Sequence, residues 1–192
     1  MSDLDLSKRL AREVALIGAR LINSGLLTAN FGNISVREGD YFFITQSGSY
    51  LEDPGNLIKV PLIGDAPTGA SIEYKAHREI YLSTRAGAVI HAHPPHSVAV
   101  SILINEVIPL DSEGEMFCPS FPVVSGKPGT DELAKAVGEG CRQSSVVLVR
   151  GHGTFTMGNT LEEAYILTSI AEHSCRVLWL LRAAGGIGSD FT

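Results

Sequence analysis

Apolar side chains recur at different periods along this sequence, and each period indicates a type of secondary structure. Between residues 4 and 24 they fall about one helical turn apart, which predicts an amphipathic helix. Gly25 follows directly and is a typical stop signal. The apolar positions concerned are Leu6, Leu10, Val14, Ile17 and Leu21.

Shorter extended segments follow this helix. Residues 33–37 and 41–45 flank Glu38-Gly39-Asp40, so we expect a β-hairpin there. Further strands are expected near residues 57–60, 87–93, 145–150 and 153–157. Helices are expected at residues 71–83, 96–103, 130–141 and 160–184. Residues 105–128, with four prolines, are expected to be mostly loop and short strand.

The order of these elements predicts an α/β fold. Helices and short strands alternate, and the hairpins argue against an all-parallel sheet, so we expect one mixed or antiparallel sheet with helices on both faces. No segment resembles a linker, and 192 residues suffice for a sizeable core, so a single domain over residues 1–192 is expected. No Gly-x-Gly-x-x-Gly or Walker-type loop indicates a nucleotide site.

Charge and composition argue against some classes of binding partner and indicate a cellular compartment. The net charge of -6 argues against nucleic acid or an anionic membrane as a partner. Residues 86–105 lack charged side chains, but their three histidines and two prolines argue against a membrane span. The acidic N-terminus does not resemble a signal peptide, and three cysteines without Cys-x-x-Cys spacing are typical of a cytoplasmic protein.

Two histidines, His91 and His93, end the apolar segment that begins at Gly87. Successive side chains on a strand point to opposite faces, so these two imidazoles share a face and can bind one divalent ion. Pro94-Pro95 then ends the strand, which places the pair at a sheet end, where active sites are usually assembled.

A third imidazole, His152, follows the apolar segment 146–149 and lies between Gly151 and Gly153. Three histidines with an open fourth position are typical of a catalytic zinc site, whereas a structural site fills all four positions. Any one of these histidines alone is better explained as an ordinary loop residue. Together, the His-x-His and Gly-His-Gly patterns at two strand ends favour a metal site.

Three short segments rich in glycine and small polar residues have the composition of an anion site. They lie around Asn33, around Ser47 and at residues 68–71. Backbone N–H groups in such turns, and the N-terminus of a helix, attract anions such as phosphate. Each segment taken alone is better explained by ordinary turn and capping chemistry.

A functional role for Glu73 requires it to lie near the three histidines, which the sequence alone does not establish. We expect it in the first turn of the helix at 71–83, where the helix dipole favours a carboxylate anyway. His77, four residues further on, is expected to be a structural partner rather than a metal ligand. His96, at a predicted helix start, and His173, in the last helix, are expected to cap or to pack.

Taken in order, these segments resemble the class II aldolase/adducin family. They cover about residues 8–182 and are most similar to the family's aldolases that cleave ketose 1-phosphates such as L-fuculose 1-phosphate. The matching segments are Gly32–Arg37, Ile44–Gly48, Ser71–Glu73 with His77 and Tyr81, Val89–His93, and Gly151–Gly153.

The resemblance implies a three-layer α/β/α fold with a central mixed, largely antiparallel sheet. It also implies a homotetramer with active sites at the subunit interfaces. Zn²⁺, or another divalent ion such as Mn²⁺ or Co²⁺, would be bound by His91, His93 and His152. Glu73 would be the acid and base of the reaction and could bind the metal in the resting state.

The substrate that the resemblance implies is a small phosphorylated sugar, cleaved reversibly by a class II aldehyde-lyase into dihydroxyacetone phosphate and a small aldehyde. Its phosphate would be bound by Asn33, Ser47, Gly48 and Ser71, with Gly32 and Thr45 close by. Two positions depart from the aldolase pattern. Ile72 stands where these enzymes have a second phosphate-binding serine. Glu113 is the candidate substitute for a tyrosine that reaches a neighbouring subunit's site.

Two other functions within the family stay open. Sugar-phosphate dehydratases of the methylthioribulose-1-phosphate type arrange similar histidines and a glutamate, and they differ from the aldolases in their product. The 4-epimerases generally have an aspartate at the place of Glu73, which argues against that branch. The adducin head domain is not an enzyme, and such a protein should have lost metal ligands, whereas this chain has all three histidines and the glutamate.

Overall fold

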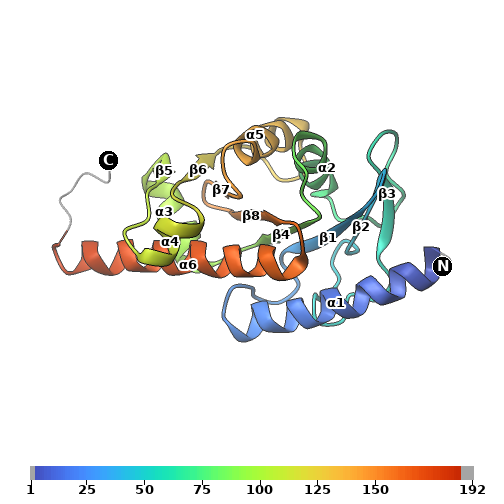
Figure 1. Cartoon of the computed structure of the whole chain (residues 1–192), viewed down its shortest axis with the longest axis horizontal. Coiled ribbons are helices and arrows are strands. Elements are labelled where there is room, and N and C mark those ends of the chain that lie inside the picture. Colours follow the sequence, from blue (N-terminus) through green and yellow to red (C-terminus); the bar gives the residue numbers. More distant parts are fainter. Residues whose placement is uncertain (1–2, 187–192) are drawn as a thin grey trace.

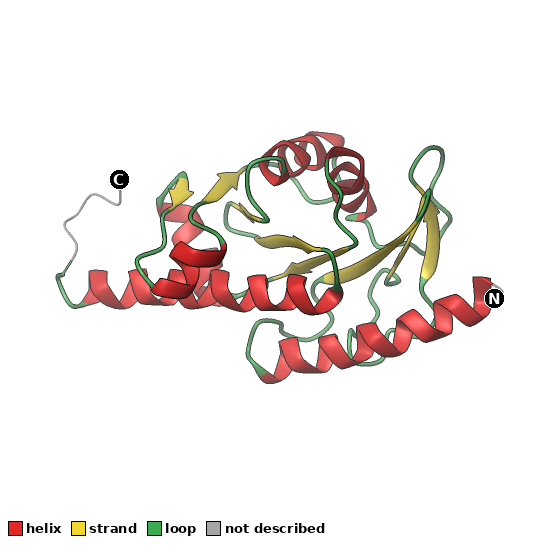
Figure 2. Cartoon of the chain, viewed as in Figure 1, coloured by secondary structure: helices red, strands yellow, loops and turns green. Residues whose placement is uncertain are grey.

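In the described part of the chain, eight strands form one mixed sheet, and helices cover both of its faces (Figures 1 and 2). The computed structural model describes residues 3–186 of the chain. The strands are β1 (Asn33–Glu38), β2 (Tyr41–Ile44), β3 (Ile58–Pro61), β4 (Ala88–Ala92), β5 (Glu106–Val107), β6 (Phe121–Val124), β7 (Val146–Val149) and β8 (Gly153–Gly158). The helices are α1 (Asp3–Asn23), α2 (Tyr74–Ser83), α3 (Pro95–Leu103), α4 (Ser112–Phe117), α5 (Asp131–Cys141) and α6 (Leu161–Ala183).

The strand order in space is β3-β2-β1-β4-β8-β7-β6-β5. Within residues 3–186, neighbouring strands are antiparallel except for the parallel pair β6 and β7. The expected α/β class with a mixed, largely antiparallel sheet is therefore confirmed. At the centre of the sheet, β4 lies between β1 and β8, and this position decides where the first histidine of the predicted metal site is placed.

One layer of helices consists of α2 and α5, which lie side by side on one face of the sheet (Figure 1). Their apolar side chains, such as Ile80 and Val137, pack against Phe42, Val89 and Phe155 of the strands in one buried cluster. Burial of such side chains stabilises the fold by about 25 cal/mol per Å² of apolar surface removed from water.

The opposite face is covered by α1, α3 and α6, with α4 packed on α6. The apolar period predicted for residues 4–24 does bury one side of α1, because Leu10, Val14, Ile17 and Leu21 contact the sheet cluster around Ile90. Two helical layers around the sheet give the three-layer α/β/α arrangement that the resemblance implied. None of the helices within residues 3–186 is both long enough and apolar enough to span a bilayer.

The hairpin and the last helix begin as the sequence predicts. Glu38 and Tyr41 are paired at the end of β1 and β2, and Gly39 in the turn has the positive φ of 63° that favours glycine. Thr160 caps α6, with its hydroxyl accepting from the backbone N–H of Glu163 at 3.2 Å.

Two predictions of the element boundaries were wrong. Helix α2 begins at Tyr74, so Glu73 is its N-cap residue and not part of the first helical turn. Helix α4 was missed within the segment 105–128, because six residues are too few to show a helical period. The sequence signal that could have revealed α4 is Asp111, whose carboxylate caps the helix by accepting from the N–H of Gly114 at 2.9 Å.

Candidate metal and anion site

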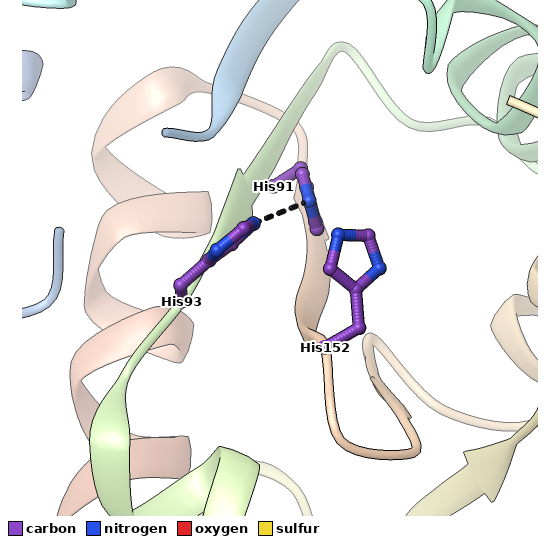
Figure 3. Close-up of side chains that lie close together, drawn as sticks. All are labelled: His91, His93 and His152. Atoms are coloured by element: carbon purple, nitrogen blue, oxygen red, sulfur yellow. Dashed lines mark hydrogen bonds between the residues drawn. The ribbon is translucent and has the colours of Figure 1, made fainter. Parts of the chain in front are cut away.

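The three predicted metal-binding histidines lie together at one end of the central strands (Figure 3). His91 is in β4, His93 follows the end of that strand, and His152 lies in the turn between β7 and β8. The Nε2 atoms of His91 and His93 are 3.0 Å apart, and one ring nitrogen from each of the three residues lies within 4.8 Å of the others. The shared strand face predicted for His91 and His93 is therefore present in the structure.

The three imidazoles are neutral near pH 7. Burial lowers the pKa of His91 well below its ordinary value, and the neighbouring His93 and His152 lower it further. Burial also lowers the pKa of His93, to about 4, and that of His152. A neutral imidazole keeps the nitrogen lone pair with which a metal is bound.

The ring of His91 is oriented by the neighbouring strand. Its Nδ1–H donates to the backbone carbonyl of Thr154 at 3.0 Å, which leaves the lone pair on Nε2 facing the other two histidines. Such a bond from the second ring nitrogen is what fixes tautomer and orientation in most metal-binding histidines. Phe155 stacks on the same ring, with the centroids 4.3 Å apart.

The two glycines that flank His152 are each required for a different structural reason. Gly151 has a φ of 66°, a conformation that other residues rarely adopt. Gly153 has an ordinary φ, but a Cβ atom there would overlap the carbonyl oxygen of Ala92 and would lie 3.0 Å from Cδ2 of His93. The Gly-His-Gly pattern thus lets the β7–β8 turn approach the end of β4 closely.

Glu73 faces the same cavity from the helical layer. Its side chain is buried, with 4% of the residue exposed, and its Oε1 atom has no hydrogen-bond partner among the described residues. Burial raises the pKa of this carboxyl group, and a hydrogen bond from the backbone of Gly129 partly opposes that rise. A buried carboxyl group with an elevated pKa is suited to take up and return a proton.

A cavity of about 280 Å³ joins all of the predicted site residues except Glu113. It is lined by the three histidines, by Glu73, and by the predicted anion-site residues Asn33, Ser47, Gly48 and Ser71. Gly32 also lines it, whereas Thr45 is buried beneath and accepts a hydrogen bond from the N–H of Ile34.

The anion-site segments are tied to one another by backbone bonds. The N–H of Ser47 donates to the carbonyl of Gly69, and the N–H of Ser71 donates to the carbonyl of Thr45. The Ser71 hydroxyl in turn accepts from the N–H of Glu73 at 3.4 Å. These bonds bring two loops that are separate in the sequence to one wall of the cavity.

Several lining residues were not anticipated from the sequence. Phe31 stacks on the ring of His93, with 5.9 Å between centroids and an interplanar angle of 5°. Asn30, Gln46 and Pro128 line the cavity as well. Only the sequence neighbourhood of Asn33 and Ser47 could have drawn attention to Asn30 and Gln46.

The donor set fits a divalent cation such as Zn²⁺. Three neutral imidazoles converge, and two buried polar atoms there, Oε1 of Glu73 and Nδ1 of His152, have no partner among the described residues. Unpaired buried polar atoms are costly, so two of them at one cavity indicate a binding partner. Three nitrogen ligands with a nearby carboxylate match a catalytic zinc site with an open position.

The remaining residues singled out from the sequence lie elsewhere. His77 is buried and makes hydrogen bonds with side chains, as a structural partner should. His96 binds the carboxylate of Glu172 through both its backbone and its ring. His173 is exposed, so the expectation that it caps or packs was wrong. Glu113 is exposed beside His173 and does not line the cavity of its own chain.

The chain is similar in sequence to a known protein family. Residues 12–179 match the class II aldolase and adducin N-terminal domain. An L-fuculose phosphate aldolase from Methanococcus vannielii is 32% identical over 151 residues, which cover 76% of this chain and 82% of that protein. A 5-methylthioribulose-1-phosphate/5-deoxyribulose-1-phosphate aldolase from Rhodospirillum rubrum is 27% identical, over 89% of this chain and 81% of that protein.

A solved structure shares the whole architecture. The crystal structure of L-fuculose-1-phosphate aldolase from Thermus thermophilus superposes with a TM-score of 0.89 at 38% sequence identity. The match covers 96% of this chain and all of that one.

Proposed function

Since this chain belongs to the class II aldolase and adducin family, we propose that it is a metal-dependent aldolase that cleaves a ketose 1-phosphate. The products are dihydroxyacetone phosphate and a small aldehyde, and the reaction is reversible. L-fuculose 1-phosphate or a similar deoxyketose phosphate is the proposed substrate, in keeping with the substrates in the names of its relatives.

The observation that carries this proposal is the composition of one cavity. A histidine cluster, a buried carboxylate without a partner and a loop wall suited to anions all face the same space of about 280 Å³. Each part alone occurs in proteins of many functions, but a phosphorylated substrate with a carbonyl group next to its reacting carbon uses all three.

The histidine cluster and Glu73 have different roles in the proposed reaction. A divalent ion held by His91, His93 and His152 would supply Lewis-acid polarisation of a carbonyl oxygen. The carboxylate of Glu73 moves the proton at the carbon where the bond to the aldehyde is made or broken. Burial raises the pKa of this carboxyl group above its ordinary value, which makes the carboxylate a stronger base than an exposed glutamate.

The anion wall anchors the donor half of the substrate. The amide of Asn33, the hydroxyls of Ser47 and Ser71, and the backbone at Gly48 bind the phosphate in this proposal. Binding energy from a group remote from the reacting carbon then orients that carbon toward Glu73.

The proposal extends to the metal, the assembly and the compartment. Zn²⁺ is the proposed ion, because three imidazoles suit it, and Mn²⁺ or Co²⁺ are the proposed substitutes. A cytoplasmic homotetramer is proposed, in which Glu113 reaches the cavity of a neighbouring subunit. That Glu113 is exposed and lies away from the cavity of its own chain supports this role.

Proton exchange on dihydroxyacetone phosphate in heavy water tests the proposal without requiring the aldehyde to be known. Zinc-loaded protein should catalyse stereospecific loss of one carbon-bound proton. The loss is measured from the NMR signal of that proton. Absence of exchange, with zinc confirmed by elemental analysis, would overturn the aldolase assignment. Formation of a diketo phosphate from methylthioribulose 1-phosphate would then identify a dehydratase, and a metal-free protein with neither activity would resemble adducin.

A further inference from the structure

A buried histidine, His77, holds the side chain of Asn33 from behind the cavity. The His77 Nε2 atom lies 2.6 Å from Oδ1 of Asn33, and its Nδ1 atom lies 2.6 Å from Oγ of Ser35. His77 is fully buried, and Asn33 is 5% exposed. Of His77, Ser35 and Asn33, only Asn33 lines the cavity, so the hydrogen bond to Asn33 is the route by which His77 acts on the cavity wall.

The direction of these hydrogen bonds follows from the far end of the network. The hydroxyl of Tyr81 lies 2.7 Å from Oγ of Ser35. Among the described residues, Ser35 Oγ is the hydrogen-bond acceptor within reach of the Tyr81 hydroxyl proton. Tyr81 is 1% exposed, and a buried hydroxyl proton without an acceptor would be costly.

The donor and the acceptor in each of the other hydrogen bonds then follow. Ser35 accepts from Tyr81 and donates its own proton to Nδ1 of His77, so the neutral ring carries its proton on Nε2. Nε2–H donates to Asn33, which therefore presents its oxygen to His77. The NH₂ end of the Asn33 amide is left for the cavity. Two N–H donors attract an anion there, whereas the amide oxygen would repel it.

We propose that His77 is a positioning residue, which turns the Asn33 amide so that its NH₂ group binds the phosphate of the substrate. This inference rests on the proposed function, because it assumes that an anion binds at the cavity wall. The Tyr81–Ser35–His77 network sets the ring tautomer and thereby the orientation of the amide.

The tautomer is measured directly on the wild-type protein, without any ligand. The ¹⁵N chemical shifts of the His77 ring should identify a neutral imidazole with its proton on Nε2. A proton on Nδ1 would overturn the proposal, whether or not the protein is an aldolase. This measurement also separates failure of the positioning role from failure of the aldolase assignment.

A matched pair of variants tests the consequence for binding of inorganic phosphate to the zinc-loaded protein. In His77→Gln the side-chain amide replaces the Nε2 donor, and the dissociation constant should stay within about twofold of wild type. In His77→Asn the amide replaces Nδ1 instead, the donor to Asn33 is lost, and binding should weaken about tenfold, which corresponds to one hydrogen bond to an anion.

A double-variant cycle confirms that His77 acts through Asn33. Asn33→Ala should weaken phosphate binding as much as His77→Asn does, and combining the two should add little, because they remove the same interaction. Additive losses, or equal affinities of His77→Gln and His77→Asn, would contradict the proposal. Thermal unfolding of each variant separates loss of binding from loss of the fold.

Discussion

Asn33 on β1 lies directly opposite His91 on β4 in the antiparallel register of the sheet. The register places the first residue of the anion wall beside the first residue of the histidine cluster, although both come from separate parts of the sequence. Residues paired directly across an antiparallel ladder have Cα atoms about 4.5–5.5 Å apart. The distance between the proposed phosphate and metal positions is therefore set by the rigid centre of the sheet.

Replacing His93 by alanine should remove the metal and the activity while leaving the fold intact. His93 follows the end of β4 and contributes one of three nitrogens to the cluster, and it is only partly buried. Elemental analysis should find little zinc, and circular dichroism should find unchanged helix content. Gln143→Ala, at an exposed position that does not line the cavity, is the control. Full zinc occupancy in His93→Ala would remove this residue from the metal site.

Glu73→Gln should keep the metal and slow turnover by about 10²–10⁴-fold, the usual contribution of a general acid or base. The substitution preserves side-chain size at the α2 N-cap but removes the group that accepts the proton. Turnover and proton exchange on dihydroxyacetone phosphate are measured together with zinc content. Glu132→Gln, at an exposed position in α5, serves as the matched control. Unchanged turnover in Glu73→Gln would exclude the proton-transfer role.

Gly153→Ala should weaken zinc binding and lower stability by about 1–3 kcal/mol, the usual cost of overpacking. The added methyl group would overlap the carbonyl of Ala92 and press on the ring of His93. Gly39→Ala is the control, because it strains a positive φ but meets no atom within 4 Å. Both variants should lose stability, and only Gly153→Ala should lose zinc affinity. Equal zinc affinities would contradict the close-packing argument.

Ile72→Ser should tighten binding of inorganic phosphate about fivefold to tenfold. Ile72 lines the cavity and is 59% exposed, so a hydroxyl there can donate to the anion, with a gain near that of one charge-assisted hydrogen bond. Isothermal titration calorimetry on the zinc-loaded protein gives the dissociation constants. Ile63→Ser, at a residue 86% exposed that does not line the cavity, should leave them unchanged. No gain from Ile72→Ser would mean that position 72 lies out of reach of the phosphate.

Acid should destabilise the metal-free protein partly through His77. Burial lowers the pKa of His77 in the folded protein to about 3, against 6.5 for the free side chain. Below pH 6.5 the unfolded chain binds a proton that the folded protein does not, so this stabilising contribution is complete above pH 6.5 and is lost as the pH falls toward 3. The loss approaches about 1.4 kcal/mol per pH unit for one proton.

The variant His77→Gln removes this titration and leaves the other histidines in place. Urea unfolding at pH 6, 5 and 4 should therefore show a shallower decline of the unfolding free energy than in the wild type. Parallel declines would mean that His77 is protonated in the folded state or does not differ from the unfolded chain.

The parts of the site that the sequence predicts are those governed by local geometry. The two-residue spacing of His91 and His93 is set by the strand period, and Gly151 and Gly153 identify the tight turn that carries His152. The hairpin at Gly39 was predicted for the same reason.

What could not be predicted depends on contacts between distant segments. Glu73 is the N-cap residue of α2, where its N–H donates to Oγ of Ser71, and the partial relief of its buried charge comes from the backbone of Gly129. The bond between His77 and Asn33 exists because α2 covers β1, which no local pattern reveals. The resemblance to the family predicted which residues belong to one site, and the contacts between them are seen only in the structure.

Glu73 and the histidines belong to different layers, and this separation has a consequence for how such a site can evolve. The pairing of β4 with β8 holds the imidazoles together, whereas Glu73 precedes α2, which rests on the sheet through Ala76 and Ile80. Substitutions under α2 can therefore shift the carboxylate without dispersing the imidazoles. Reactivity and metal affinity can therefore change independently during evolution. Selection for new substrates can act on the helical layer with little loss of metal affinity.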